Sequence, residues 1–112
     1  MYIKTIDIAH PPLSSNVAEK LLDDEILQVR NSRELRALKV IHGYGSIAGR
    51  GVLKEVVKNW TYQNRKHLLA VIPGEEYSMV NTKTMEMRKV CGQISDPDLD
   101  ASNQGITIIW VK

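Results

Sequence analysis

Three side chains at the ends of two apolar segments could carry acid–base chemistry. Asp7 lies in the apolar run at residues 2–9, His10 follows that run directly, and His42 ends the run at residues 37–42. A histidine exchanges protons near neutral pH, which makes it a suitable general acid or base. If two parallel strands carry these residues, their carboxyl ends meet at the sheet edge where α/β proteins bind ligands. Asp7, His10 and His42 are therefore the candidate catalytic residues.

A glycine-rich segment follows His42 and precedes an amphipathic helical pattern. Glycines let a ligand approach the backbone, and the free amides at a helix start bind phosphate. Two lysines four residues apart would add positive charge on one face of that helix. Tyr44 is as consistent with stacking on a base as with packing in the interior. The expected nucleic-acid-binding residues are Gly43, Tyr44, Gly45, Ser46, Gly49, Arg50, Gly51, Lys54 and Lys58.

Two common phosphate-binding motifs do not account for this loop. A P-loop requires Lys and then Ser or Thr after its second glycine, whereas the spacing from Gly45 leads to Arg50 and Gly51. The dinucleotide motif G-x-G-x-x-A fits Gly43, Gly45 and Ala48. Its acidic residue, however, is expected about 20 positions later, where the chain is apolar. A tight turn without a ligand remains an alternative.

The distribution of charge points to the same part of the chain. The protein has 112 residues and a net charge of +2, which alone is too small to indicate a nucleic-acid partner. Residues 31–67, however, carry eight cationic and two acidic side chains, while the segments on either side are net acidic. Neighbouring cations add their fields and attract phosphates, although solvated lysines on a surface would give the same pattern.

Apolar periodicity predicts the elements that hold these residues. Strands and helices alternate, which favours parallel strands covered by helices. The connection to the last strand lacks a clear crossover helix, so that strand is free to run antiparallel. We expect a β-α-β-α-β-β mixed sheet with two main helices in a two-layer α/β sandwich. The predicted strands are 2–9, 37–42, 68–72 and 106–111, the main helices 14–30 and 52–59, and a short helix 82–90, with 75–105 as a decorated connection.

Composition indicates one soluble domain covering residues 1–112. The chain is 43% hydrophobic and 25% charged, which is typical of globular proteins. No apolar run approaches the roughly 18 residues needed to span a bilayer. The single cysteine, Cys91, cannot form an internal disulfide, so we expect a reducing, cytoplasmic location and no membrane partner. The sequence does not indicate the oligomeric state.

The motifs then resemble a known family. The run Ile41-His42-Gly43-Tyr44-Gly45-Ser46, followed by Gly49-Arg50-Gly51, resembles the HGxG loop of Smr (small MutS-related) domains. The element order and the segments at residues 72–77 and 105–108 also resemble that family, so the similarity covers nearly the whole chain. It implies a mixed α/β sandwich, nucleic-acid binding and, in several members, endonuclease activity on DNA or RNA.

One motif departs from the family pattern. The resemblance implies an L-D-L-H-G motif at the end of the first strand, with its aspartate and histidine important for cleavage. Here Asp7 is kept, but Ala9 occupies the histidine position and His10 lies one residue further on. A one-residue shift turns a strand side chain to the opposite face, unless the strand end bulges. Binding is less affected than cleavage.

Several alternatives follow from this departure. A nuclease of this kind often uses a divalent cation, Mg²⁺ or Mn²⁺, and the sequence leaves the metal requirement open. A non-catalytic module that uses the glycine loop for a protein or another ligand is the alternative function.

Asp96, Asp98 and Asp100 alternate as in a calcium loop, but the required glycine and final glutamate are missing. A solvated acidic loop is the better interpretation of those aspartates.

Overall fold

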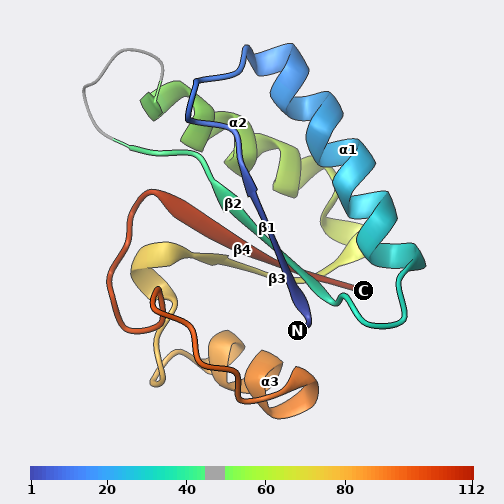
Figure 1. Cartoon of the computed structure of the whole chain (residues 1–112), viewed down its shortest axis with the longest axis vertical. Coiled ribbons are helices and arrows are strands. Elements are labelled where there is room, and N and C mark those ends of the chain that lie inside the picture. The colour runs from blue at the N-terminus through green and yellow to red at the C-terminus, as the bar shows by residue number, and fades with distance from the viewer. Residues whose placement is uncertain (45–49) are drawn as a thin grey trace.

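The computed structural model describes residues 1–44 and 50–112. Over that part of the chain it forms a four-stranded mixed sheet and three α-helices (Figure 1). The strand order is β1-β2-β4-β3; β1 and β2 are parallel, and β4 runs antiparallel to both of its neighbours. The elements are β1 (Ile3–Asp7), α1 (Ser15–Asn31), β2 (Ala37–Ile41), α2 (Arg50–Gln63), β3 (Leu68–Pro73), α3 (Thr82–Cys91) and β4 (Ile106–Val111), with 3₁₀ helices η1 (Arg65–His67) and η2 (Gly74–Glu76).

This architecture confirms the predicted mixed α/β fold class. The predicted strands and the helix at residues 14–30 agree with the structure to within two residues, and the final strand is antiparallel. Helix α2 is longer than predicted, since it begins at Arg50 and continues to Gln63. The short helix predicted at residues 82–90 is also present, as α3.

Helix α1 begins and ends where side chains satisfy its free backbone groups. The Ser14 hydroxyl accepts a hydrogen bond from the Val17 amide at 3.4 Å, as expected of an N-cap. At the other end, the Arg36 guanidinium donates to the carbonyl oxygens of Val29 and Ser32 at 2.9 and 2.8 Å. The Val29 carbonyl also accepts from the Ser32 amide at 3.1 Å, and the added hydrogen bonds from the Arg36 cation stabilise the C-terminus of α1.

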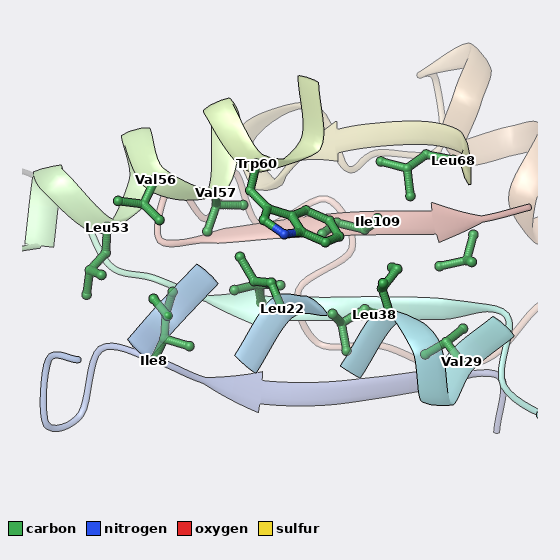
Figure 2. Packing of buried hydrophobic residues seen from close by; sticks show 14 residues of the cluster. Ile8, Leu22, Val29, Leu38, Leu53, Val56, Val57, Trp60, Leu68 and Ile109 are labelled. Atoms are coloured by element: carbon green, nitrogen blue, oxygen red, sulfur yellow. The ribbon is translucent and has the colours of Figure 1, made fainter. Parts of the chain in front are cut away.

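A hydrophobic core fills the space between the sheet and the α1–α2 layer. Figure 2 shows side chains from both helices meeting side chains from β2 and β4 in this space. Trp60 lies near the centre, and its indole nitrogen donates to Asp23 of α1 at 2.8 Å. This core fixes the helices on the sheet and thereby fixes where α1 and α2 begin. Its labelled residues are Ile8, Leu22, Val29, Leu38, Leu53, Val56, Val57, Trp60, Leu68 and Ile109.

The segment at residues 74–105 covers the opposite face of the sheet. A second apolar cluster buries Tyr77 and Met87 against Ile72, Ile108 and Trp110. Helix α3 lies on this side, away from α1 and α2 (Figure 1). The segment predicted as a decorated connection therefore also contributes to the core, because its apolar side chains cover strands that α1 and α2 leave open.

Candidate nucleic-acid interface

Asp7, His10 and the start of the glycine loop lie at the edge of the sheet where β1 and β2 end. Parallel β1 and β2 both end there, with Asp7 paired in register with Ile41. The N-termini of α1 and α2 lie at the same edge (Figure 1). Helix N-termini carry free amides and partial positive charge, so this edge favours anionic ligands.

A tight turn after β1 brings His10 back to Asp7. The Leu13 amide donates to the Ile8 carbonyl at 2.9 Å, so the chain reverses around residues 9–12. One carboxylate oxygen of Asp7 accepts hydrogen bonds from the backbone amides of Ala9 and His10 at 2.8 and 3.1 Å. Nδ1 of His10 lies 2.9 Å from the other oxygen, Oδ2. The chain therefore turns back after a regular strand end, and this turn, not a bulge, brings the displaced histidine to Asp7.

The Asp7–His10 pair has the geometry of an oriented general base. A carboxylate only accepts hydrogen bonds, so Nδ1 of His10 carries the proton and donates it to Asp7. Partial burial would raise the pKa of Asp7, but hydrogen bonds from Ala9 and His10 outweigh burial and hold that pKa below its usual value. The His10 side chain is 51% exposed, and among the described residues its Nε2 atom has no hydrogen-bond partner. The Nε2 side of the ring is therefore open to solvent.

His42 lies in a different environment and does not join this pair. Its side chain is fully buried, and Nδ1 donates to the Gly43 carbonyl oxygen at 2.6 Å. Because that carbonyl only accepts, Nε2 is the acceptor for the Thr107 hydroxyl at 2.8 Å. Burial lowers the pKa of His42, with a smaller contribution from nearby Lys54, so the ring is neutral near pH 7. This histidine holds β2 to β4.

Strand alternation explains why Asp7 and His42 are separated. Asp7 and Ile41 are register partners in a parallel pair, so their side chains point to the same face. His42 is the next residue, and its side chain points to the opposite face. The structure therefore brings together Asp7 and His10, but it places His42 across the sheet. A phosphate at this edge does not reach the buried His42 ring directly.

The start of the glycine loop is held to β4 by its backbone. The amides of His42 and Gly43 both donate to the carbonyl of Gly105, at 2.9 and 3.0 Å. Gly43 has a φ of 70°, a left-handed conformation that favours glycine. Tyr44 follows beside Gly105 and is 51% exposed. Gly45, Ser46 and Gly49 lie outside the described residues, as do the side chains at positions 50 and 51.

The two predicted lysines of α2 differ in their surroundings. Lys54 forms an ion pair with Glu75 at 3.1 Å and donates to the Gln104 carbonyl at 3.0 Å. Burial would raise the pKa of Glu75, but its own backbone amide and Lys54 keep that pKa below its usual value. Lys58 is exposed, but both lysines border a groove of about 260 Å³ that three glutamates also line. Carboxylates therefore offset much of the predicted positive charge.

Comparison with known proteins adds the family. The sequence matches the family model of the Smr domain over residues 12–79, which is more than half of the chain. The chain belongs to the Smr domain family. The fold is similar to the crystal structure of the Smr domain of Thermus thermophilus MutS2, with a TM-score of 0.57 and 13% sequence identity. That similarity covers 100% of this chain and 99% of the other. No curated protein matches the sequence.

The family match includes the glycine loop but begins after Asp7 and His10. In this Smr domain, the candidate catalytic role of Asp7 and His10 therefore rests on the sequence and the geometry alone. Among the described residues, no three His, Cys, Asp or Glu side chains are grouped so as to hold a metal ion. None of the described helices is long and apolar enough to cross a membrane.

Sequence reasoning missed an ion-pair network on the second face of the Smr domain. Lys39 of β2 donates to Asp96 and to Asp98, each at 2.7 Å, and Tyr77 donates to Asp96 at 2.9 Å. The predicted solvated acidic loop is therefore wrong for Asp96 and Asp98, because the buried Lys39 ammonium holds both carboxylates. Strand alternation could have placed Lys39 on an inward face, but nothing local indicates partners 57 and 59 residues away.

Proposed function

We propose that this Smr domain binds single-stranded or structured nucleic acid at the edge where β1 and β2 end. The observation that carries the proposal is the Asp7–His10 pair, whose imidazole is exposed at the edge that also holds the start of α2. Family membership supports the same conclusion. Free amides at the start of α2 bind backbone phosphate, and the exposed ring of Tyr44 stacks on a base.

Binding tests the first part of this proposal. Labelled DNA and RNA oligonucleotides, single-stranded and hairpin, are titrated with the protein at several salt concentrations and followed by fluorescence anisotropy. Loss of one stacked base costs about 1–3 kcal/mol, so Tyr44→Ala weakens binding roughly 5- to 150-fold. Tyr62→Ala is the matched control, since Tyr62 is exposed on the last turn of α2, away from this edge.

The salt dependence identifies phosphate contacts. Each cation that neutralises a phosphate releases counterions, so binding weakens as salt rises. The double variant Arg50→Ala with Lys54→Ala reduces affinity and flattens that dependence. Unchanged binding in both this variant and Tyr44→Ala moves the interface elsewhere. Absence of binding to every DNA and RNA tested favours the alternative, a module that uses the glycine loop for a protein partner.

The geometry of His10 supports a second candidate function, phosphodiester hydrolysis. In this step Nε2 of His10 takes a proton from water as the water oxygen attacks phosphorus. The bond from phosphorus to the leaving ester oxygen breaks, and that oxygen takes a proton from solvent. Asp7 keeps the ring oriented and stabilises the positive charge that forms on it.

Cleavage is tested with supercoiled DNA and structured RNA, each in chelator, Mg²⁺ and Mn²⁺. General-base catalysis contributes about 10²- to 10⁴-fold, so His10→Ala and Asp7→Asn should each remove most of the nicking. His67→Ala serves as the control, because His67 lies in η1 at the start of β3. Nicking that persists in both variants would show that these residues do not catalyse it. Comparing nicking in chelator, Mg²⁺ and Mn²⁺ tests whether cleavage requires a divalent cation. Mg²⁺ often binds through one or two carboxylates plus substrate phosphates.

A further inference from the structure

The two outer strands of the sheet differ in sequence. The strand order makes β1 and β3 these outer, or edge, strands. The edge strand β1 carries the charged residues Lys4 and Asp7. Natural proteins use such charges to prevent edge strands from pairing with other chains. Strand β3 has only apolar residues before Pro73, in the sequence Leu-Leu-Ala-Val-Ile. Edge β3 therefore lacks protecting charges within the strand, and its pairing with β4 is regular from Ala70 to Pro73, after a register shift between Leu68 and Ala70.

The outer side of β3 is also open. Leu69 and Val71 are 44% and 38% exposed, although both are large apolar residues on a strand. Among the described residues, the backbone hydrogen bonds formed outside helices and strands involve none of residues 69–73. Val71 lines the groove of about 260 Å³ between α2 and β3. An apolar strand with a free backbone edge is a template for pairing with another strand.

The charges at the two ends of β3 indicate which strand would pair with it. The residues before the strand are basic, Arg65 and Lys66, and those after it are acidic, Glu75 and Glu76. All four side chains are exposed. If a second β3 lies antiparallel, the basic end of each copy meets the acidic end of the other. A parallel arrangement would instead place like charges together.

We propose that β3 pairs with β3 of a second copy of this chain, about a two-fold axis perpendicular to the sheet. The two sheets then become one continuous eight-stranded sheet. With Val71 of one copy opposite Val71 of the other, opposed side chains share a face of the sheet, and Lys66 lies opposite Glu76. The axis keeps both α2 helices on the same side of the joined sheet, so the grooves beside Val71 flank the new pair of strands. The exposed apolar side chains of β3, Leu69 and Val71, then become buried.

The experiment measures mass in solution by sedimentation velocity and light scattering, from micromolar to millimolar protein without nucleic acid. The intact protein shows a concentration-dependent monomer–dimer equilibrium. Val71→Lys places two lysines near the axis and weakens the dimer at least about tenfold, because each change counts twice. Leu27→Lys is the matched control, since Leu27 is also a large exposed apolar residue but lies on α1. Circular dichroism verifies that each variant is folded.

Charge reversal tests the antiparallel arrangement itself. Lys66→Glu weakens the dimer by bringing acidic groups together at both ends, and the double variant Lys66→Glu with Glu76→Lys restores it. Only a pairing that brings each basic end to the partner's acidic end gives that rescue. A protein that stays monomeric at all concentrations, or a dimer unaffected by Val71→Lys, overturns the proposal. Because no nucleic acid is present, this result is independent of the proposed binding function.

Discussion

Replacing Lys39 with methionine removes a buried cation and leaves two carboxylates without it. Lys39 lies 2.7 Å from Asp96 and 2.7 Å from Asp98, and its side chain and that of Asp96 are 8% and 5% exposed. Methionine keeps the length and most of the volume of lysine, so the change removes charge without leaving a large cavity. The destabilisation then measures the cost of an uncompensated buried carboxylate.

The magnitude follows from the burial of the pair. Removing one partner of a buried ion pair costs about 3–5 kcal/mol. A domain of 112 residues has a free energy of unfolding of roughly 6–17 kcal/mol. Lys39→Met therefore removes a large fraction of the total stability. At about 4 °C per kcal/mol for a domain of this size, the Tm falls by roughly 12–20 °C.

Urea denaturation followed by circular dichroism measures this loss. Lys89→Met is the control, because Lys89 is exposed on α3 and its replacement should change stability by no more than about 0.5 kcal/mol. Asp96→Asn and the double variant complete a double-mutant cycle. The two groups are in contact, so the double variant should be more stable than the sum of the single losses predicts. Equal stability of Lys39→Met and Lys89→Met would refute the reasoning.

The same network gives a pH dependence. Burial would raise the pKa of Asp96, but hydrogen bonds from Lys39, the Asp98 amide and Tyr77 outweigh it and hold that pKa below its usual value. An unfolded aspartate titrates near 3.9, so the stabilisation is complete above about pH 4 and is lost as pH falls through the lower folded pKa. The stability difference between the natural protein and Asp96→Asn should therefore shrink in acid. A difference that stays constant below about pH 4 contradicts the assignment.

Two further predictions concern His42 and Gly74. Burial lowers the pKa of His42, so below about pH 6.5 the unfolded chain takes up a proton that the folded chain resists. The free energy of unfolding therefore decreases as the pH is lowered. Urea denaturation at about pH 7.5 and about pH 5.5 should show a smaller loss in His42→Gln than in the natural protein; equal losses would exclude His42 as the cause. A Cβ at Gly74 would overlap the Asn103 carbonyl oxygen and the Ile106 side chain, so Gly74→Ala should cost roughly 1–3 kcal/mol by the same assay. A cost under about 0.5 kcal/mol would mean that this turn adjusts freely.

Local patterns in the sequence determined the elements and much of their order. The apolar stripe of α1 and the β-branched run of β4 are local signals, because each element must bury one face or both faces. The glycine loop after His42 indicated the family for the same reason, since its letters and spacing are local. The sequence also placed His10 near Asp7 in the chain, but the turn that brings its ring back to the Asp7 carboxylate was not readable from the letters.

The tertiary structure decided which side chains are available for function. Lys39 and Lys54, counted as part of a basic surface, are paired with carboxylates from residues 75–98, and Arg36 stabilises the end of α1. His42 is buried, since the path of β4 beside β2 places Thr107 against its ring. The pairings of Lys39, Lys54 and His42 join residues 21 to 65 positions apart, so they depend on how the strands are ordered in the sheet. A charge's position in the sequence does not show whether folding brings it a partner, because the free energy of a buried charge depends on the groups that surround it in space.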